Sequence, residues 1–279
     1  TLKASDSWTN TTFVDEDKEV VLKQLLGNGT TGNASLAFDL KLKKIVVAKI
    51  IYKQLIIDRN RVGTTFNEIR ILQKIPVHEN ICQFYRSFET PTKIYLILEY
   101  CGANHLYKSI GRLREPDIKS FAKQILLGHK ALHEAGIYHM DSAPVNIVVS
   151  ANNQIKIIDF GNSLTCNDKS TRIPNILNGF RSYEMFMQTE YTPEKFDIWV
   201  DGVLIYYMFK FRMPWGFYDD FNYYARLYKL KLLFPVNRRP QPSDLAQDLI
   251  AKILVKEENR PTIDEILAHP WFHETENKP

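Results

Sequence analysis

Two stretches of the sequence place oxygen-bearing side chains beside short apolar runs. Asp141 and Asn146 lie in His-Met-Asp-Ser-Ala-Pro-Val-Asn, and Asp159 opens Asp-Phe-Gly after an apolar run. Carboxylate and amide oxygens are the ligands that Mg²⁺ prefers, together with phosphate oxygens of a substrate. A carboxylate can also accept a proton. The pattern indicates metal and proton chemistry on a phosphate, with an ordinary turn among solvated polar residues as the alternative.

The segment between these residues predicts a small hairpin. Residues 147–150 and 154–158 are apolar enough to form its two arms, and Ala-Asn-Asn at 151–153 suits its turn. A hairpin of this size returns Asn146 and Asp159 to the same end. The two side chains would then be close enough to share one ion.

A glycine-rich segment joins two predicted strands near the beginning of the chain. Gly27, Gly29 and Gly32 match G-x-G-x-x-G, and they separate the strand predicted at 20–26 from the strand predicted at 34–38. Because the glycines join two strands instead of opening a helix, they favour a flap over phosphates and not a dinucleotide fold. A plain hairpin turn is the alternative.

A lysine and a glutamate further along could form an ion pair. Lys49 interrupts the β-branched strand predicted at 45–51, and Glu68 lies in the helix predicted at 61–72. A buried lysine without an anionic partner is costly, so the pair is expected with or without a catalytic role. For the helix, we expect an inward stripe of apolar residues, namely Phe66, Ile69 and Leu72.

The remaining pattern predicts a change from strands to helices. Two more strands are expected at 83–88 and 94–100, and Cys-Gly-Ala-Asn at 101–104 is predicted to link two lobes. Helices are expected with a buried face along 118–132, with an apolar surface nearly all round at 196–209, and at 245–254 and 263–267. The predicted fold class is α+β, and its parts are a polar leader 1–18, a small β-rich lobe 19–101 and a larger helical lobe 102–279.

Composition limits the classes of partner and compartment. The 279 residues are 44% hydrophobic and carry a net charge of +4, without the dense Lys/Arg runs of a nucleic-acid-binding face. No apolar stretch approaches the roughly 20 residues that a membrane helix needs. The three cysteines, Cys82, Cys101 and Cys166, lack metal-ligand spacing, so we predict neither a disulfide framework nor a zinc site, in a reducing compartment. Because the chain begins with Thr1, we expect it to be part of a longer protein.

The order and spacing of these motifs resemble the eukaryotic protein kinase family, of the serine/threonine type. The resemblance covers about residues 20 to 273 and adds several short motifs to those above. They are Val-Val-Ala-Lys at 46–49, Leu-Glu-Tyr-Cys at 98–101, Asp-Ile-Trp at 197–199, Asn-Arg-Pro at 259–261 and His-Pro-Trp-Phe at 269–272. The resemblance implies the bilobal protein kinase fold and the cofactors ATP and Mg²⁺.

Residue roles follow from the resemblance. Lys49 is expected to contact the α- and β-phosphates and to pair with Glu68, while Asn146 and Asp159 hold Mg²⁺. Asp141 is expected to accept or orient the substrate hydroxyl, so the catalytic set is Asp141, Lys49 and Glu68. The residues expected to bind the nucleotide, with Leu98 as gatekeeper and the backbone of Glu99 and Cys101 on adenine, are Leu26, Gly27, Gly29, Gly32, Ala34, Val47, Lys49, Leu98, Glu99, Cys101 and Val148.

The catalytic loop departs from the family pattern. Met140 stands where most relatives have an arginine that binds a phosphorylated activation segment, which argues against that form of switching. Ala143 replaces the lysine that contacts the transferring phosphate in serine/threonine kinases, and Val145 lacks the arginine of tyrosine kinases. Losing one such electrostatic contact costs on the order of 10²-fold in rate.

Other departures concern the helical lobe. Asp201 stands where relatives usually have an apolar residue, and the sequence offers no account of it. Glu184 is aligned with the glutamate that pairs with Arg260, with Met187 as a competing alignment. Phosphorylation in the activation segment is considered at Ser163, Thr165, Ser170 and Thr171, with ordinary solvated loop residues as the alternative.

The function predicted is transfer of the ATP γ-phosphate to serine or threonine of protein substrates, with reduced activity. The main alternative is an ATP-binding pseudokinase that acts as a scaffold or allosteric partner, which Met140 and Ala143 favour. A small-molecule phosphotransferase is a third interpretation. The expected partners are a protein substrate and a regulatory protein, without nucleic acid or a membrane span, and the expected location is intracellular, in the cytoplasm, the nucleus or both.

Overall fold

A computed structural model of the chain describes residues 13–14, 19–166, 178–216, 222–234 and 241–274. The contacts divide the chain into two compact units. Unit 1 contains the residues up to Ile75 together with Cys82–Ala103. Unit 2 contains Pro76–Ile81 and the residues from Asn104 onward.

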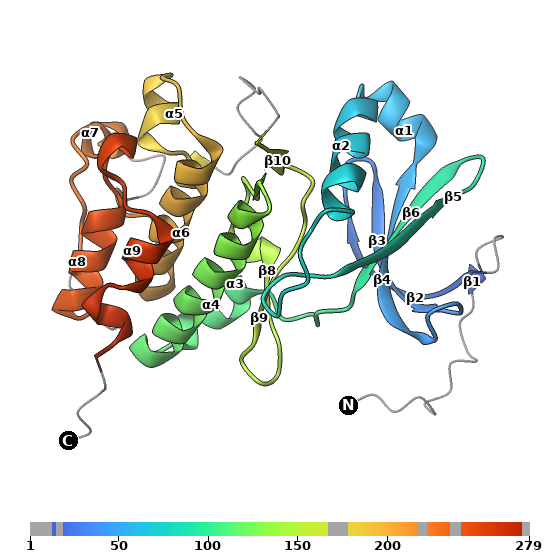
Figure 1. Cartoon of the computed structure of the whole chain (residues 1–279), viewed down its shortest axis with the longest axis horizontal. Helices are drawn as coiled ribbons and strands as arrows, with labels where there is room; N and C mark the ends of the chain where they lie inside the picture. Colours follow the sequence, from blue (N-terminus) through green and yellow to red (C-terminus); the bar gives the residue numbers. More distant parts are fainter. Residues whose placement is uncertain (1–12, 15–18, 167–177, 217–221, 235–240, 275–279) are drawn as a thin grey trace. The chain divides into compact units, whose positions relative to one another are not determined.

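Unit 1 is built on one antiparallel sheet with the strand order β1-β2-β3-β4-β6-β5 (Figure 1). The strands are β1 (Phe13–Val14), β2 (Val20–Asn28), β3 (Gly32–Asp39), β4 (Lys44–Tyr52), β5 (Phe84–Glu89) and β6 (Lys93–Glu99). The strands predicted from the sequence are confirmed. β2 extends past Gly27, so only three residues, 29–31, separate it from β3.

The two faces of this sheet have different surroundings because side chains alternate along each strand. One face is buried in an apolar cluster that includes Val46, Ala48 and Ile97. The other face carries Val47 and Lys49, whose cross-strand neighbours on β6 are Leu98 and Leu96. The second face is therefore the one that presents the lysine.

Two helices follow β4 in unit 1, α1 (Lys53–Asp58) and α2 (Val62–Leu72). The predicted helix is confirmed, and of its predicted inward stripe Leu72 is buried and Ile69 half-buried, but the placement of Phe66 is wrong. Phe66 is 59% exposed, and the buried residues of α2 are Thr65, Glu68, Ile71 and Leu72. The buried face is turned by about one residue because Glu68 points inward to meet a lysine on the sheet.

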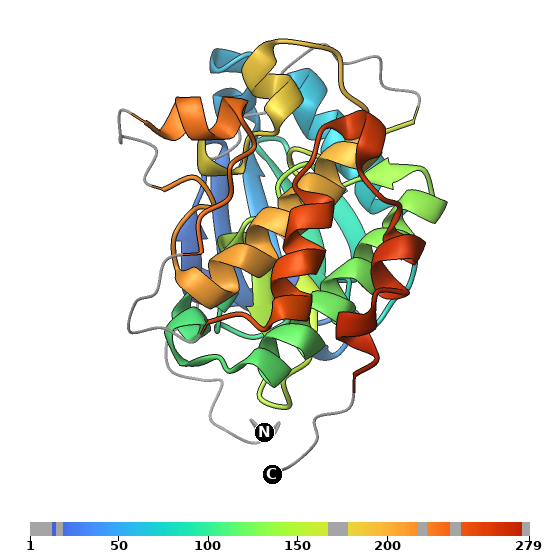
Figure 2. The same cartoon turned by 90° about the vertical axis from the view of Figure 1, so that its left-hand side faces the viewer.

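Unit 2 is mainly helical. Its helices are α3 (Leu106–Ser109), α4 (Glu115–Glu134), α5 (Tyr183–Met187), α6 (Pro193–Lys210), α7 (Tyr223–Tyr228), α8 (Asp244–Ile253) and α9 (Ile263–Leu267). Short 3₁₀ turns occur at Ile110–Arg112, Pro144–Asn146, Asn178–Phe180, Glu257–Asn259 and Pro270–Phe272. Helix α6 contacts both α4 and α8, and Figure 2 shows these three helices side by side. Because α6 is buried on nearly every side, it forms the centre of this core, as its apolar surface predicts.

Two small antiparallel sheets complete unit 2. β7 (Ile137–Tyr138) pairs with β10 (Leu164–Thr165), and β8 (Ile147–Val149) pairs with β9 (Ile155–Ile157). The second pair is the predicted hairpin. Its turn includes Asn153 with φ 59°, a left-handed conformation that asparagine adopts more readily than most residues.

Among the residues that the structure describes, no helix combines the length and the apolar composition that crossing a membrane takes.

Candidate active site

The predicted lysine and glutamate are joined in unit 1. Lys49 Nζ lies 2.6 Å from Glu68 Oε1. Lys49 is anchored at the centre of the sheet, between Ala34 on β3 and Leu96 on β6. The pair is only partly exposed, so the carboxylate fixes the direction of the ammonium group and offsets part of the cost of burying it.

The three glycines of the G-x-G-x-x-G motif differ in how much space the structure leaves for a side chain. A Cβ on Gly32 would lie 1.8 Å from the carbonyl oxygen of Ile50, so the neighbouring strand β4 excludes any side chain there. A Cβ on Gly27 would meet nothing within 4 Å, and one on Gly29 would meet only the carbonyl oxygen of Gly32 at 3.6 Å. Neither packing nor a positive φ requires glycine at these two positions. Their bare backbone fits close approach by a phosphate group.

The other residues predicted to bind the nucleotide occupy both units. In unit 1, Ala34, Val47 and Leu98 are half-buried on the face that carries Lys49, while Leu26 is 39% exposed. In unit 2, Val148 is buried and its backbone bridges to His105. The nucleotide-binding roles of these residues stay predictions.

Asp141 lies in unit 2, where two amide groups hold its carboxylate. Asn146 Nδ2 and Asn162 Nδ2 each donate to Asp141 Oδ2 at 3.1 Å. Burial raises the pKa of Asp141 to about 6, and the negative charge of Asp159 acts in the same direction, while the two amides oppose the shift. A carboxylate with this pKa is suited to accept a proton near neutral pH. The sequence pattern did not identify Asn162, which comes directly after Asp-Phe-Gly.

The predicted metal ligands lie at one end of the β8–β9 hairpin. The backbone N–H of Ile158 donates to the carbonyl oxygen of Asn146 at 2.9 Å, which places Asp159 next to that hydrogen bond. Asn146 Nδ2 also donates to the carbonyl oxygen of Asp141 at 2.8 Å. Because its amide nitrogen is engaged in this way, Asn146 has its oxygen left to serve as a ligand. The carboxylate of Asp159 is exposed, so the donor set fits a hard cation such as Mg²⁺.

A buried carboxylate on α6 holds the start of the catalytic loop. Asp197 accepts the backbone N–H groups of His139 at 2.7 Å and Met140 at 2.8 Å, and His133 Nε2 lies 2.9 Å away. Burial raises the pKa of Asp197. The hydrogen bond with His133 and the nearby rings of His129, His133 and His139 outweigh burial and hold the pKa below its usual value. Met140 has φ 66°, a strained conformation that the two backbone hydrogen bonds stabilise.

His139 links the loops that carry Asp141 and Asp159. Its ring lies 3.1 Å from the carbonyl oxygen of Ile158 through Nε2, and Nδ1 accepts the backbone N–H of Asp141 at 3.2 Å. Burial lowers the pKa of His139 to about 4. The imidazole is therefore neutral at physiological pH, with the proton on Nε2, and it serves as a structural connector.

The unexpected Asp201 belongs to a buried polar chain. Asp201 Oδ2 lies 2.9 Å from His129 Nδ1, and His129 Nε2 lies 2.6 Å from Ser142 Oγ. All three side chains are at most 1% exposed. Burial lowers the pKa of His129, but the charge and hydrogen bond of Asp201 outweigh this effect and raise it above the ordinary value. These two hydrogen bonds connect α4 and α6 to Ser142, the residue that follows Asp141.

Two of the three departures in the catalytic loop are buried. Met140 is 0% and Ala143 2% exposed, and both belong to the apolar core of unit 2. Where relatives carry cations, this loop therefore contributes packing, and Val145, at 44% exposed, adds no charge.

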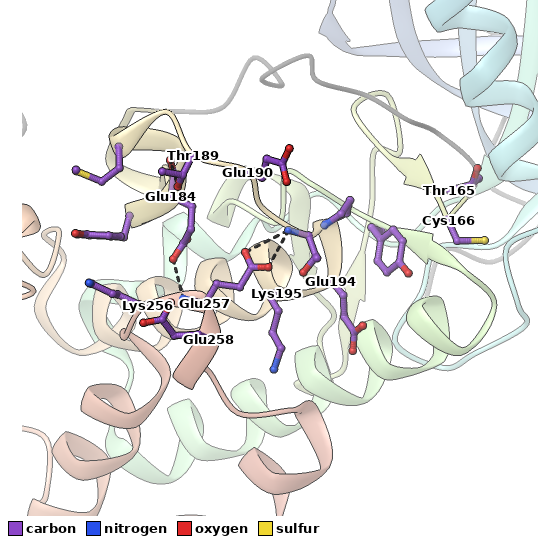
Figure 3. Close-up of a pocket in the computed structure, with 15 residues that line it drawn as sticks. Thr165, Cys166, Glu184, Thr189, Glu190, Glu194, Lys195, Lys256, Glu257 and Glu258 are labelled. Carbon is purple, nitrogen blue, oxygen red and sulfur yellow. Dashed lines mark hydrogen bonds between the residues drawn. The ribbon is translucent and has the colours of Figure 1, made fainter.

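The predicted pairing of Glu184 with Arg260 is confirmed. Arg260 Nη2 lies 3.0 Å from each carboxylate oxygen of Glu184, and both side chains are buried. A pocket of about 1200 Å³ lies beside this pair (Figure 3). There Glu184 Oε1 accepts the backbone N–H of Glu257 at 2.8 Å, and the Glu257 carboxylate accepts the N–H of Thr192 at 3.0 Å. None of the predicted site residues lines this pocket, so its position gives no support to the nucleotide site.

The structure removes two of the four candidate phosphorylation sites. Ser163 is 2% exposed and donates its hydroxyl to the carbonyl oxygen of His139 at 3.1 Å. Thr165 is 8% exposed and lies in β10. Ser170 and Thr171 lie outside the described residues.

Comparison with known proteins places the chain in a family. The sequence model of the protein kinase domain matches residues 20–272. A probable serine/threonine-protein kinase of Dictyostelium discoideum is 32% identical over 257 residues, which are 90% of this chain and 30% of that protein. CBL-interacting serine/threonine-protein kinase 12 of Arabidopsis thaliana is 28% identical, over 89% of this chain and 51% of that protein. Sperm motility kinase 3A of Mus musculus is 30% identical, over 92% of this chain and 50% of that protein.

The chain belongs to the protein kinase family, and its two units have the strand-rich and helical compositions of the bilobal kinase fold. It spans about one third to one half of the length of these curated relatives.

Proposed function

We propose that this chain is an ATP-dependent protein kinase domain that phosphorylates serine or threonine. The observation that carries the proposal is the setting of Asp141, whose carboxylate is held by two amides and has its pKa raised to about 6. A scaffold that only binds nucleotide does not need a poised base in this loop. The names of the relatives support serine/threonine specificity.

The proposed roles follow from the contacts of each side chain. Asp141 accepts the proton of the substrate hydroxyl, whose oxygen forms a bond to the γ-phosphorus as the bond from that phosphorus to the ADP oxygen breaks. Lys49, directed by Glu68, binds phosphate oxygens of the nucleotide. When bound at Asn146 and Asp159, Mg²⁺ supplies charge stabilisation on the phosphates. The protein contributes mainly positioning and electrostatics.

The test combines nucleotide binding with product analysis. Mg²⁺ and ATP together should raise the melting temperature of the wild-type protein, and Asp159→Asn should abolish the Mg²⁺-dependent part of that increase. A protein substrate labelled from [γ-³²P]ATP should contain phosphoserine or phosphothreonine. An unchanged increase in Asp159→Asn would overturn the metal assignment, and phosphotyrosine alone would overturn the specificity.

The second candidate function is an ATP-binding pseudokinase with a scaffolding or allosteric role. The buried Met140 and Ala143, which take the places of two cations, favour this alternative. ATP binding without phosphate transfer to any protein would establish it. Transfer to a small metabolite but never to a protein would instead support a small-molecule phosphotransferase. Protein substrates, a regulatory partner and an intracellular location stay predictions.

A further inference from the structure

Two cysteines that are distant in sequence lie together in unit 1. Cys82 lies two residues before the start of β5, and Cys101 lies two residues after the end of β6. The backbone N–H of Glu99 donates to the carbonyl oxygen of Gln83 at 2.8 Å and joins the two segments. Strand pairing therefore brings together two thiols that are 19 positions apart.

These thiols and one carboxylate form a compact set of donor atoms. One ligand atom each from Cys82, Glu99 and Cys101 lies within 4.8 Å of the other two. Both sulfur atoms also lie 3.6 Å from the same backbone oxygen, the carbonyl of Glu99. Two sulfur atoms, one carboxylate oxygen and one carbonyl oxygen are therefore potential donors in this cluster. Among the described residues, this is the group of metal-binding side chains with such a geometry.

The spacing of the donors fits a small tetrahedral cation. With Zn–S bonds of about 2.3 Å and Zn–O bonds of about 2.0 Å, the sulfur and oxygen ligands of one ion lie about 3.5 Å apart. The two observed sulfur–oxygen distances of 3.6 Å are close to this value. The side-chain donors, at up to 4.8 Å, need to close by about 1 Å, which changes in the half-buried side chains of Glu99 and Cys101 can supply.

We propose that Cys82, Cys101 and Glu99 bind a zinc-class divalent cation, with the carbonyl oxygen of Glu99 or a water as the fourth ligand. Thiolate sulfur selects zinc, cobalt and cadmium over Mg²⁺, which prefers oxygen ligands. Binding replaces the protons of the two thiols with metal–sulfur bonds.

The surroundings of the site support ligation. Cys82 is 6% exposed, so its sulfur is shielded from bulk water. The backbone N–H of Gln83 donates to Glu99 Oε2 at 3.1 Å and orients the carboxylate. Hydrogen bonds of this kind from a second layer fix the position of a metal ligand and strengthen binding.

A metal ion at this site should also affect nucleotide binding, an effect that rests on the proposed function. The backbone of Glu99, whose carbonyl oxygen both sulfurs contact, is expected to form a hydrogen bond with adenine. A cation held by the two thiols either coordinates that carbonyl oxygen or lies close enough to hinder its hydrogen bonds. Zinc-class cations should therefore weaken ATP binding.

The metal site is tested without nucleotide, by titrating the protein with Co²⁺ and then displacing it with Zn²⁺. Tetrahedral cobalt with thiolate ligands should give intense visible absorption that saturates at one ion per chain and persists in excess Mg²⁺. Cys82→Ala and Cys101→Ala should each weaken binding by more than the roughly 10- to 100-fold that loss of an outer hydrogen bond costs. Glu99→Gln, which keeps an oxygen for the Gln83 N–H, should weaken it as well.

Cys166→Ala is the matched control, because this third thiol is exposed and lies in unit 2. It should leave the cobalt spectrum unchanged. Absence of the thiolate absorption in a folded wild-type protein would overturn the site, as would loss of the absorption in Cys166→Ala alone. Because Cys101 is half-buried, its variant decides the question even if Cys82→Ala fails to fold.

The effect on nucleotide is measured separately, as the ATP affinity with and without Zn²⁺. A drop in affinity that Cys101→Ala abolishes supports the competition. Unchanged ATP affinity in the zinc-loaded protein would overturn the competition while the spectra continue to define the metal site. Failure of the metal-free protein to bind ATP would contradict the proposed function, and the cobalt titration would still decide whether the metal site exists.

Discussion

His129 Nδ1 lies 2.9 Å from Asp201 Oδ2 in the interior of unit 2, and both side chains are at most 1% exposed. The contact joins α4 to α6, the two longest helices of the unit. Through Ser142, it also reaches the residue next to Asp141. An acidic residue in a helix that is otherwise apolar nearly all round therefore has a specific partner.

This pairing predicts a strong dependence of each residue on the other. Asp201→Leu should lower the free energy of unfolding by about 3 kcal/mol, because it leaves His129 buried without its carboxylate. Adding His129→Leu should recover part of that loss, since the double variant leaves neither member of the pair buried without the other. Urea unfolding of the two single variants and the double variant gives the coupling energy. Additive effects of the two substitutions would contradict the account.

The glycines near the beginning of the chain should separate stability from nucleotide binding. Gly32→Ala should unfold at a clearly lower temperature, because its Cβ would overlap the carbonyl oxygen of Ile50. Gly27→Ala and Gly29→Ala should change stability by less than about 0.5 kcal/mol, since an added Cβ meets open space at Gly27 and only an ordinary van der Waals contact at Gly29. Both should nevertheless weaken ATP binding. Equal destabilisation by all three substitutions would show that the glycines serve only the turn.

The pH dependence of the reaction should report the state of Asp141. Only the ionised carboxylate can accept a proton, and its pKa is raised to about 6, so kcat/KM should fall below pH 6 with a midpoint near that value. The amide of Asn162 favours the ionised form, so Asn162→Ala should raise the pKa and move the midpoint to higher pH. A midpoint near 4, or a shift to lower pH in the variant, would exclude Asp141 as the titrating group.

The sequence pattern predicted the strands of unit 1, the long helices and the hairpin after Asn146, because each has a clear alternation or helical period. It also predicted two contacts between distant residues, Lys49 with Glu68 and Glu184 with Arg260. The first pair was expected because a buried lysine needs an anionic partner. The second was found through the family resemblance, which carries information about spatial neighbours that spacing along the chain does not.

The contacts that the sequence pattern missed are made by side chains whose partners come from distant segments. Asn162 offers no signal of its own, and its role depends on the path of the loop after Asp-Phe-Gly. Cys82 and Cys101 do not have the short spacing of known metal motifs, so only strand pairing shows that they meet. The inward placement of Phe66 on α2 was also predicted wrongly, because an ion pair turned Glu68 inward and left Phe66 exposed.

The missing cation of the catalytic loop can be restored. Ala143→Lys should raise kcat by on the order of 10²-fold if the new ammonium group reaches the transferring phosphate. Because Ala143 is 2% exposed, the longer side chain has to extend out of the core, which should lower the melting temperature. Ala143→Met, of similar length without charge, separates the two effects. An equal kcat in the lysine and methionine variants would show that the missing charge does not limit the rate.

The most direct measurement of the central claim is phosphate transfer from labelled ATP to the chain itself and to a general protein substrate, with Mg²⁺, beside Asp141→Asn. This variant keeps an oxygen that can accept the two amide hydrogen bonds but cannot act as a base. We predict slow incorporation by the wild-type protein and a loss of at least about 10²-fold in the variant. Equal incorporation by both proteins, or none by a wild-type protein that binds ATP, would contradict catalysis by Asp141.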